Sequence, residues 1–151
     1  MLTLFQLAGA GRCPSLSPSC VKLETWLRMS AIPHRTEPGV MADAPKGKLP
    51  YIEDNGERIG DATLILDHLR TRYGIDLDRE LGTREKMTSL AFRRLLKEHL
   101  YWILLYFRWQ PDQGYLAYRD IIGAAALPGL PFDERRAVID SLRPRFVGQL
   151  E

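Results

Sequence analysis

The first forty residues alternate short apolar runs with one amphipathic stretch. Leu2–Leu7 carries apolar residues in a strand-like alternation, and His34–Glu37 is a second, shorter strand candidate. Between them, the apolar residues of Ser17–Ser30 support a helix, with a serine at the N-cap and Pro18 at the first helical position. Pro33 stops this helix because proline cannot continue the helical hydrogen bonds. The pattern predicts a strand, a helix and a strand in that order.

A hairpin and a second helix follow an irregular loop over residues 38–48. Tyr51–Glu53 and Glu57–Gly60 are strand-like, and the Asn55-Gly56 pair between them suits a turn with positive φ. A helix over Asp61–Tyr73 comes next, with the aspartate as its N-cap. Strand, helix, strand, hairpin and helix together form the thioredoxin-like arrangement.

A polar segment over residues 76–82 separates this pattern from a different one. Acidic and basic side chains dominate the segment, which is typical of an interdomain linker. The sequence therefore predicts a domain over residues 1–75 and a separate helical region over residues 83–151.

Helical spacing dominates the second region. The apolar stripes of Thr83–Trp109 predict one long helix that Pro111 ends. A weaker helix is expected over residues 113–126, and a third from Asp133 into Pro144, which should kink or end it. The region has room for about three helices.

Composition and charge exclude several classes of protein. With 45% hydrophobic and 26% charged residues, the 151-residue chain matches soluble globular averages. Its 21 basic and 19 acidic residues are spread along the chain, so no basic tract is present to bind a series of phosphates and a nucleic-acid partner is not expected. The longest apolar run, Ile103–Phe107, is far too short to span a membrane. We expect a soluble, cytoplasmic protein.

Three separated motifs carry a resemblance to a known family. They are Ser17-Pro18-Ser19-Cys20, Lys48-Leu49-Pro50-Tyr51 and Asp61-Ala62-Thr63. In this order they resemble the glutathione S-transferase superfamily, whose cis-proline loop, hairpin and third helix are similar to residues 44–69. Residues 22–29 look closest to the branch related to failed axon connections and metaxin. The resemblance implies an α/β plus all-α fold, in which a partial, shortened helical domain of the transferase type follows a thioredoxin-like domain.

The resemblance implies roles for the first two motifs. Ser17 stands where serine- or cysteine-type transferases place the residue that hydrogen-bonds the glutathione sulfur; the alternative is an ordinary N-cap. A cis bond before Pro50 would turn the backbone of Leu49 outward to pair with an extended ligand, and we expect that isomer here. Lys48 could reach the glycyl carboxylate of glutathione, or could be a solvated loop lysine.

The third motif would bind the other end of glutathione. Asp61 can receive the cationic amino group of the γ-glutamyl moiety, cap its helix, or do both. Many transferases follow this acid with serine, but here the position is Ala62. A hydrogen bond to the ligand carboxylate is lost unless Thr63 substitutes, and the loss would cost about 1 kcal/mol.

The two cysteines are candidates for redox chemistry, although reduced thiols without a disulfide are the preferred interpretation. Cys20 stands where redox relatives carry the second cysteine of a two-cysteine motif. Because Ser17 replaces the first, disulfide reductase chemistry is not expected, and a small buried residue is the favoured alternative. Cys13 lies in a loop, where its thiol is either reactive or an ordinary, unreactive loop thiol.

The histidines and aromatic residues complete the set of candidates. No histidine has a carboxylate or cysteine at metal-ligand spacing, so no metal site is expected. One stripe of the long helix carries His99, Trp102, Tyr106 and Trp109. This stripe suits a pocket for a hydrophobic co-substrate, but packing in a core or an interface is the favoured interpretation.

Two functions from different classes follow. The first is a transferase that conjugates the glutathione thiolate to a small hydrophobic electrophile, with glutathione as co-substrate. The second is a non-catalytic binding or adaptor module with the same fold. In either case the apolar circumference of the helix over residues 83–109 exceeds what two short helices can cover, so we expect a homodimer.

Overall fold

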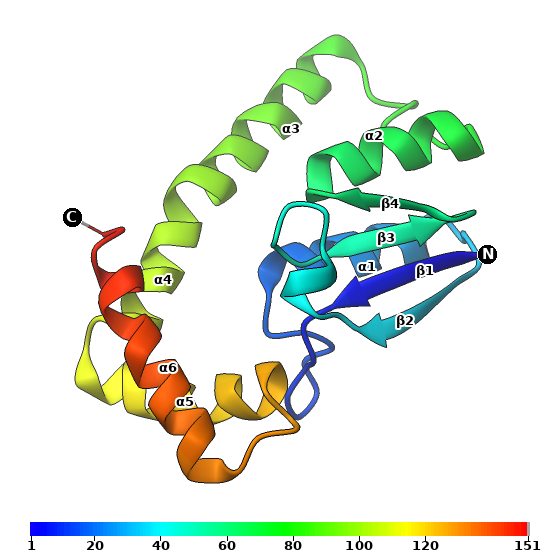
Figure 1. The fold of residues 1–151 in the computed structure, drawn as a ribbon. Helices are drawn as coiled ribbons and strands as arrows, with labels where there is room; N and C mark the ends of the chain where they lie inside the picture. Colours follow the sequence, from blue (N-terminus) through cyan, green and yellow to red (C-terminus); the bar gives the residue numbers. More distant parts are fainter. Residues whose placement is uncertain (151) are drawn as a thin grey trace. The chain divides into compact units, whose positions relative to one another are not determined.

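The computed structural model describes residues 1–150 and shows two units, residues 1–77 and the part of the chain from residue 78 onward. In the first unit, a helix connects two strands, a short 3-10 turn follows, and a hairpin leads into a second helix (Figure 1). These elements are β1 (Leu2–Gln6), α1 (Pro18–Met29), β2 (His34–Pro38), η1 (Met41–Asp43), β3 (Tyr51–Asp54), β4 (Glu57–Gly60) and α2 (Ala62–Tyr73).

The strands form one mixed sheet in the order β2-β1-β3-β4. Strand β2 pairs parallel to β1, as the helical crossover α1 requires, whereas β3 pairs antiparallel to both β1 and β4. The hairpin turn has positive φ at Asn55 (51°) and Gly56 (87°), as the Asn-Gly pair predicts. The thioredoxin-like arrangement expected from the sequence is confirmed.

The core of this unit lies on one face of the sheet. Leu4 of β1 and Ile52 of β3 point to this face, and α1 and α2 both cover it with fully buried side chains. The helical contributions are Leu23, Leu27, Ile65 and Leu69. Burial of each such side chain is worth about 1.5–3 kcal/mol, so this face fixes how both helices pack on the sheet.

The second unit is entirely helical. It consists of α3 (Thr83–Leu95), a π-helical segment η2 (Leu96–Leu100), α4 (Tyr101–Trp109), α5 (Asp112–Ala126) and α6 (Phe132–Val147). The single long helix expected over residues 83–109 is therefore wrong in one respect, because a π turn interrupts it. A π turn closes its hydrogen bonds over five residues, and the apolar stripes on both sides of it still read as one 3.6-residue pattern.

Of the two effects expected at Pro144, a kink or an end of the helix, the end is wrong. Helix α6 continues through Pro144 to Val147, one turn beyond it. Proline removes one backbone donor, but near a helix end little of the ladder remains to be disrupted. The carbonyl of Pro144 still accepts from the N–H of Gly148 at 2.9 Å, which closes the last turn.

A large apolar surface remains exposed on α3, η2 and α4. Its exposed side chains are Met87, Leu90, Phe92, Leu95, Leu96, Leu100, Tyr101, Trp102, Ile103, Tyr106 and Phe107. Monomeric soluble proteins rarely expose large contiguous apolar patches, so this many exposed apolar side chains on one helical run is unusual. Within residues 1–150, no helix is long and apolar enough to cross a membrane.

Candidate functional site

The register of the sheet brings two of the predicted motifs together. Phe5, near the end of β1, pairs with Tyr51 at the start of β3, and Tyr51 pairs with Gly60 at the end of β4. Pro50 immediately precedes Tyr51, and Asp61 immediately follows Gly60. Because the strands are antiparallel, these two residues leave the sheet side by side at the same edge. This edge is the one where β1 and β4 end and β3 begins.

Ser17 reaches the same edge through the loop that follows β1. The N–H of Leu16 donates to the carbonyl of Ala8 at 3.2 Å, so the loop returns to the end of β1 just before α1 begins. Ser17 occupies the N-cap position, as predicted, with φ −97° and ψ 120°. Its side chain makes no capping hydrogen bond, which leaves the hydroxyl at the N-terminus of α1 for another partner.

The backbone of Leu49 also lacks an internal partner. The bond between Leu49 and Pro50 is cis, as expected. Strand β3 begins only at Tyr51, and no backbone hydrogen bond within residues 1–150 involves Leu49. Its N–H and C=O can therefore pair with an extended ligand, as an added strand would. Lys48, beside it, is exposed.

Asp61 combines a helix cap with an unusual backbone conformation. Its carboxylate accepts from the N–H of Thr63 at 2.8 Å, so the capping part of its expected role is present. Its φ of 76° and ψ of 119° lie outside the left-handed helical region that non-glycine residues sometimes adopt. Such strain costs on the order of 1–3 kcal/mol and is concentrated at ligand-binding and catalytic positions. Ala62, the next residue, is half-buried.

The two cysteines differ in their surroundings, and both are free thiols. Cys20 is completely buried on the sheet-facing side of α1, as the alternative of a small core residue requires. Cys13 is exposed in the loop before α1, where its thiol donates to the carbonyl of Ser15 at 2.9 Å.

Glu24 is a buried carboxylate on α1 that was not predicted from the sequence. Glu24 lies two turns after Ser17, where it accepts from Gln6 Nε2 at 2.7 Å and from the guanidinium of Arg28. Burial raises the pKa of Glu24, but the hydrogen bonds from Gln6 and Arg28 and the charge of Arg28 outweigh it and lower the pKa below its usual value. Its position four residues after Cys20 and three before Leu27, on the apolar face of the predicted helix, is the signal that could have revealed it.

A second buried carboxylate, Asp54, lies at the end of β3. It accepts from His68 Nε2 at 3.0 Å and from the hydroxyl of Tyr73 at 3.1 Å, both on α2. The strand expected from the sequence ends at Glu53, just before Asp54, and no sequence pattern singles out His68. Only the packing of α2 on the hairpin brings them together.

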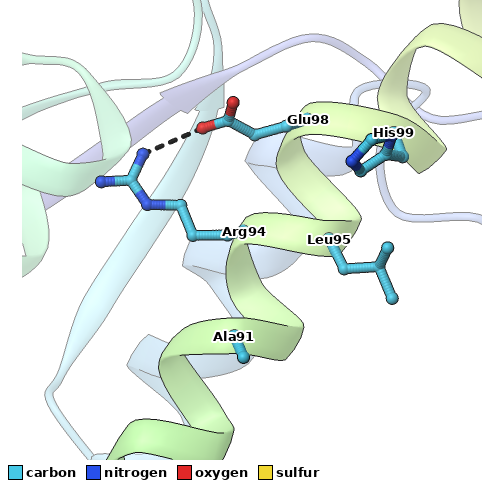
Figure 2. Close-up of a pocket in the computed structure, with 5 residues that line it drawn as sticks. All are labelled: Ala91, Arg94, Leu95, Glu98 and His99. Atoms are coloured by element: carbon cyan, nitrogen blue, oxygen red, sulfur yellow. Dashed lines mark hydrogen bonds and ion pairs between the residues drawn. The ribbon is translucent and has the colours of Figure 1, made fainter.

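The co-substrate candidates of the second unit are not gathered in one place. His99, with Ala91, Arg94, Leu95 and Glu98, lines a hollow on α3 and η2, where Arg94 donates to Glu98 at 2.9 Å (Figure 2). All five lining residues are exposed and come from one continuous helical run, so the hollow is open. Trp102 and Tyr106 do not line it, and both are exposed, so packing in the core of this unit is wrong for them. Packing of these two side chains in an interface stays a prediction.

Comparisons with known proteins show what the chain is similar to. Residues 18–114 match the family model of the glutathione S-transferase N-terminal domain. The chain is 34% identical over 155 residues to the isoprene-epoxide–glutathione S-transferase of Rhodococcus sp. (strain AD45), covering 97% of this chain and 63% of that protein. It is 36% identical over 121 residues to Failed axon connections of Drosophila melanogaster, covering 79% of this chain and 29% of that protein.

Two further similarities are more distant. Metaxin-3 of Xenopus laevis is 28% identical over 103 residues, covering 68% of this chain and 33% of that protein. The solved structure of glutathione S-transferase III in apo form superposes with a TM-score of 0.55 at 18% identity, covering 98% of this chain and 69% of that one. This superposition shows a shared fold. The chain spans less than two thirds of the length of each of the three sequence relatives.

Proposed function

Because the chain belongs to the glutathione S-transferase superfamily, we propose that it binds glutathione at the sheet edge of β1, β3 and β4 and conjugates its thiolate to a small hydrophobic electrophile. The observation that carries this proposal is the strand register. Pairing of Phe5 with Tyr51, and of Tyr51 with Gly60, brings Leu49 and Asp61 to one edge. Ser17 begins α1 beside that edge.

Each group in the site suits one part of a bound tripeptide. The N–H and C=O of Leu49 pair with the cysteinyl backbone, as in strand addition. Lys48 reaches the glycyl carboxylate, and the carboxylate of Asp61 receives the amino group of the γ-glutamyl end. Three anchors hold the sulfur at a fixed place, next to the N-terminus of α1.

The chemistry needs the thiolate form of glutathione. The thiol releases its proton to water, the Ser17 hydroxyl donates to the resulting thiolate sulfur, and the positive end of the α1 dipole stabilises its negative charge. The sulfur then attacks an electrophilic carbon and forms a C–S bond while the bond to the leaving atom breaks. When that atom is an epoxide oxygen, it keeps the electron pair and takes a proton from water. The name of the Rhodococcus relative makes an epoxide the first electrophile to test.

The first test is binding to immobilised glutathione. We expect the purified chain to be retained and to elute with free glutathione. Asp61→Asn should weaken binding at least tenfold, because a charge-assisted hydrogen bond is worth about 1.5–3 kcal/mol. Asparagine still caps helices and tolerates positive φ, so the fold should persist. The control Asp67→Asn changes an exposed acid on the same helix and should bind like the parent. Failure of the parent chain to bind would refute the proposal.

The alternative of a non-catalytic binding module is favoured by Ala62. Restoring the missing hydroxyl by Ala62→Ser should tighten glutathione binding by about 1 kcal/mol, or roughly fivefold. Titration calorimetry measures this change. A parent chain that binds glutathione and conjugates neither an epoxide nor another reactive electrophile would support the module and exclude the transferase.

The exposed apolar surface of α3, η2 and α4 supports a homodimer. A two-fold partner that presents the same surface would cover it. Light scattering at micromolar concentration should give about twice the chain mass of 17.3 kDa, roughly 35 kDa. Phe107→Glu places a charge on this surface and should shift the mass to that of one chain. A monomeric parent at that concentration contradicts the dimer.

The cytoplasmic location expected from composition stays a prediction.

A further inference from the structure

The carboxylate of Asp54 holds helix α2 to the hairpin. Asp54 is only 4% exposed, and its Oδ2 lies 3.0 Å from His68 Nε2. Its Oδ1 accepts from the hydroxyl of Tyr73 at 3.1 Å and from Asn55 Nδ2 at 3.2 Å. Burial of a carboxylate is costly unless donors surround it, and here three side chains do so. Two of the three donors belong to α2.

Helix α2 is therefore attached to the hairpin at both of its ends. Its first residue follows β4 through Asp61 alone, and the helix packs along β4 and β3 (Figure 1). Its last residue, Tyr73, bonds to Asp54, which immediately precedes the hairpin turn. The helix also packs on the core through its own side chains Ile65 and Leu69. Apolar contacts are not directional, so they would let α2 slide along the sheet. The hydrogen bonds to Asp54 fix the position of the helix along its axis.

That position matters for the backbone of Asp61. A residue with φ of 76° and ψ of 119° keeps its strain only when the structure on both sides determines it. On one side Gly60 is paired with Tyr51, and on the other side α2 must stay in place. If α2 shifts, Asp61 can relax to negative φ and carry its carboxylate away from the sheet edge.

We propose that Asp54, His68 and Tyr73 form a positioning cluster that fixes α2 and thereby holds Asp61 in its ligand-binding conformation. The cluster sets the affinity for the γ-glutamyl end of the ligand without touching it. This inference rests on the proposed glutathione site, since it assigns Asp61 to that end.

Three variants test the cluster. His68→Leu removes the donor to Asp54, whereas His68→Gln keeps an N–H near the position of Nε2. His34→Leu is the matched control, because His34 is also half-buried but pairs with Leu2 at the far end of β1. We expect His68→Leu to raise the glutathione Kd about tenfold, and the KM for glutathione equally, with kcat at saturation within twofold. His68→Gln and His34→Leu should stay within twofold of the parent.

A second measurement does not depend on glutathione. The N–H of Ile65 donates to the carbonyl of Asp61 at 2.9 Å, so its hydrogen exchange reports whether α2 keeps its first turn. Exchange should be at least tenfold faster in His68→Leu and unchanged in His68→Gln. If His68→Leu does not fold, Tyr73→Phe removes only a hydroxyl and should change exchange and Kd in the same direction.

The outcomes separate the two proposals. Unchanged exchange at Ile65 overturns the positioning cluster, whether or not the chain binds glutathione. Faster exchange with an unchanged Kd overturns it as well, because Asp61 would then not depend on α2. Faster exchange in a chain whose parent form does not bind glutathione refutes the proposed function and supports the mechanical link between Asp54 and Asp61.

Discussion

Replacing Ser17 with alanine is expected to lower kcat/KM for glutathione conjugation at least tenfold and to leave the fold intact. The variant loses one hydrogen bond to the thiolate, worth about 1.5–3 kcal/mol when the acceptor is charged. Each 1.36 kcal/mol corresponds to about a tenfold change in rate, so the expected range is roughly 10- to 150-fold. The measurement is the initial rate with an epoxide and with a generic electrophile.

Stability should change little in the same variant. An N-cap serine usually contributes about 1 kcal/mol through its side chain, but the side chain of Ser17 makes no capping hydrogen bond. Ser19→Ala is the matched control, because Ser19 is an exposed serine in the first turn of the same helix. Thermal unfolding of all three proteins should agree closely, and only Ser17→Ala should lose rate.

The pH dependence gives an independent check on the role of Ser17. Without the hydroxyl, the glutathione thiol keeps a pKa closer to that of a free thiol, about 8.5. The variant should therefore gain more rate than the parent between pH 6.5 and 8.5, and its deficit should shrink as the pH rises. A parent-like rate at all pH values would contradict this role of Ser17 and move the catalytic role to the exposed thiol of Cys13.

Local signals in the sequence were enough to predict the first unit. Proline at position 18 fixes φ near its helical value, and glycine at position 56 permits the positive φ that the turn needs, so the start of α1 and the turn of the hairpin follow directly. The approximate positions of Ser17, Leu49 and Asp61 on these elements follow as well. Their meeting at one edge requires the pairing of β1 with β3, which joins residues almost fifty positions apart and has no local signal.

The features that the sequence did not reveal depend on packing. The π turn at Leu96–Leu100 adds a residue without disturbing the apolar pattern, so periodicity reads through it. Asp54 and Glu24 look like surface acids because Gln6, which donates to Glu24, and His68, which donates to Asp54, lie on other elements of the fold. Trp102 and Trp109 fall on the same predicted stripe, yet one is exposed and the other is buried.

The buried tryptophan leads to the second large expected effect, the loss of much of the stability of the helical unit in Trp109→Ala. Trp109 is 4% exposed and stacks on Phe146 of α6, with ring centres 4.1 Å apart and an interplanar angle of 20°. Its ring also meets Tyr115 and Tyr118 of α5 at 6.0 Å and 5.7 Å. One side chain therefore joins the end of α4 to both of the helices that follow.

The backbone of Trp109 is part of the same junction. Its carbonyl accepts from Arg143 Nε at 2.9 Å, and Arg143 Nη2 donates to the carbonyl of Gln110 at 2.7 Å. These bonds satisfy carbonyl groups that the end of α4 leaves without helical partners. In Trp109→Ala the carbonyl remains, but Phe146 no longer holds α6 against α4. The hydrogen bonds of Arg143 to the carbonyls of Trp109 and Gln110 would then have to hold α6 against the end of α4, in competition with water.

Truncation of a buried tryptophan to alanine costs about 3–5 kcal/mol, against a total of roughly 5–15 kcal/mol for a typical domain. Urea unfolding followed by far-ultraviolet circular dichroism should show this loss in the helical signal, whereas tryptophan fluorescence would be confounded by removal of the reporter. Phe132→Ala is the control. Phe132 is half-exposed on α6, and within residues 1–150 it contacts only Arg136 among the aromatic and cationic pairs. Its replacement should therefore lower the free energy of unfolding by no more than about 1 kcal/mol. Equal losses in the two variants would mean that Trp109 does not join the three helices.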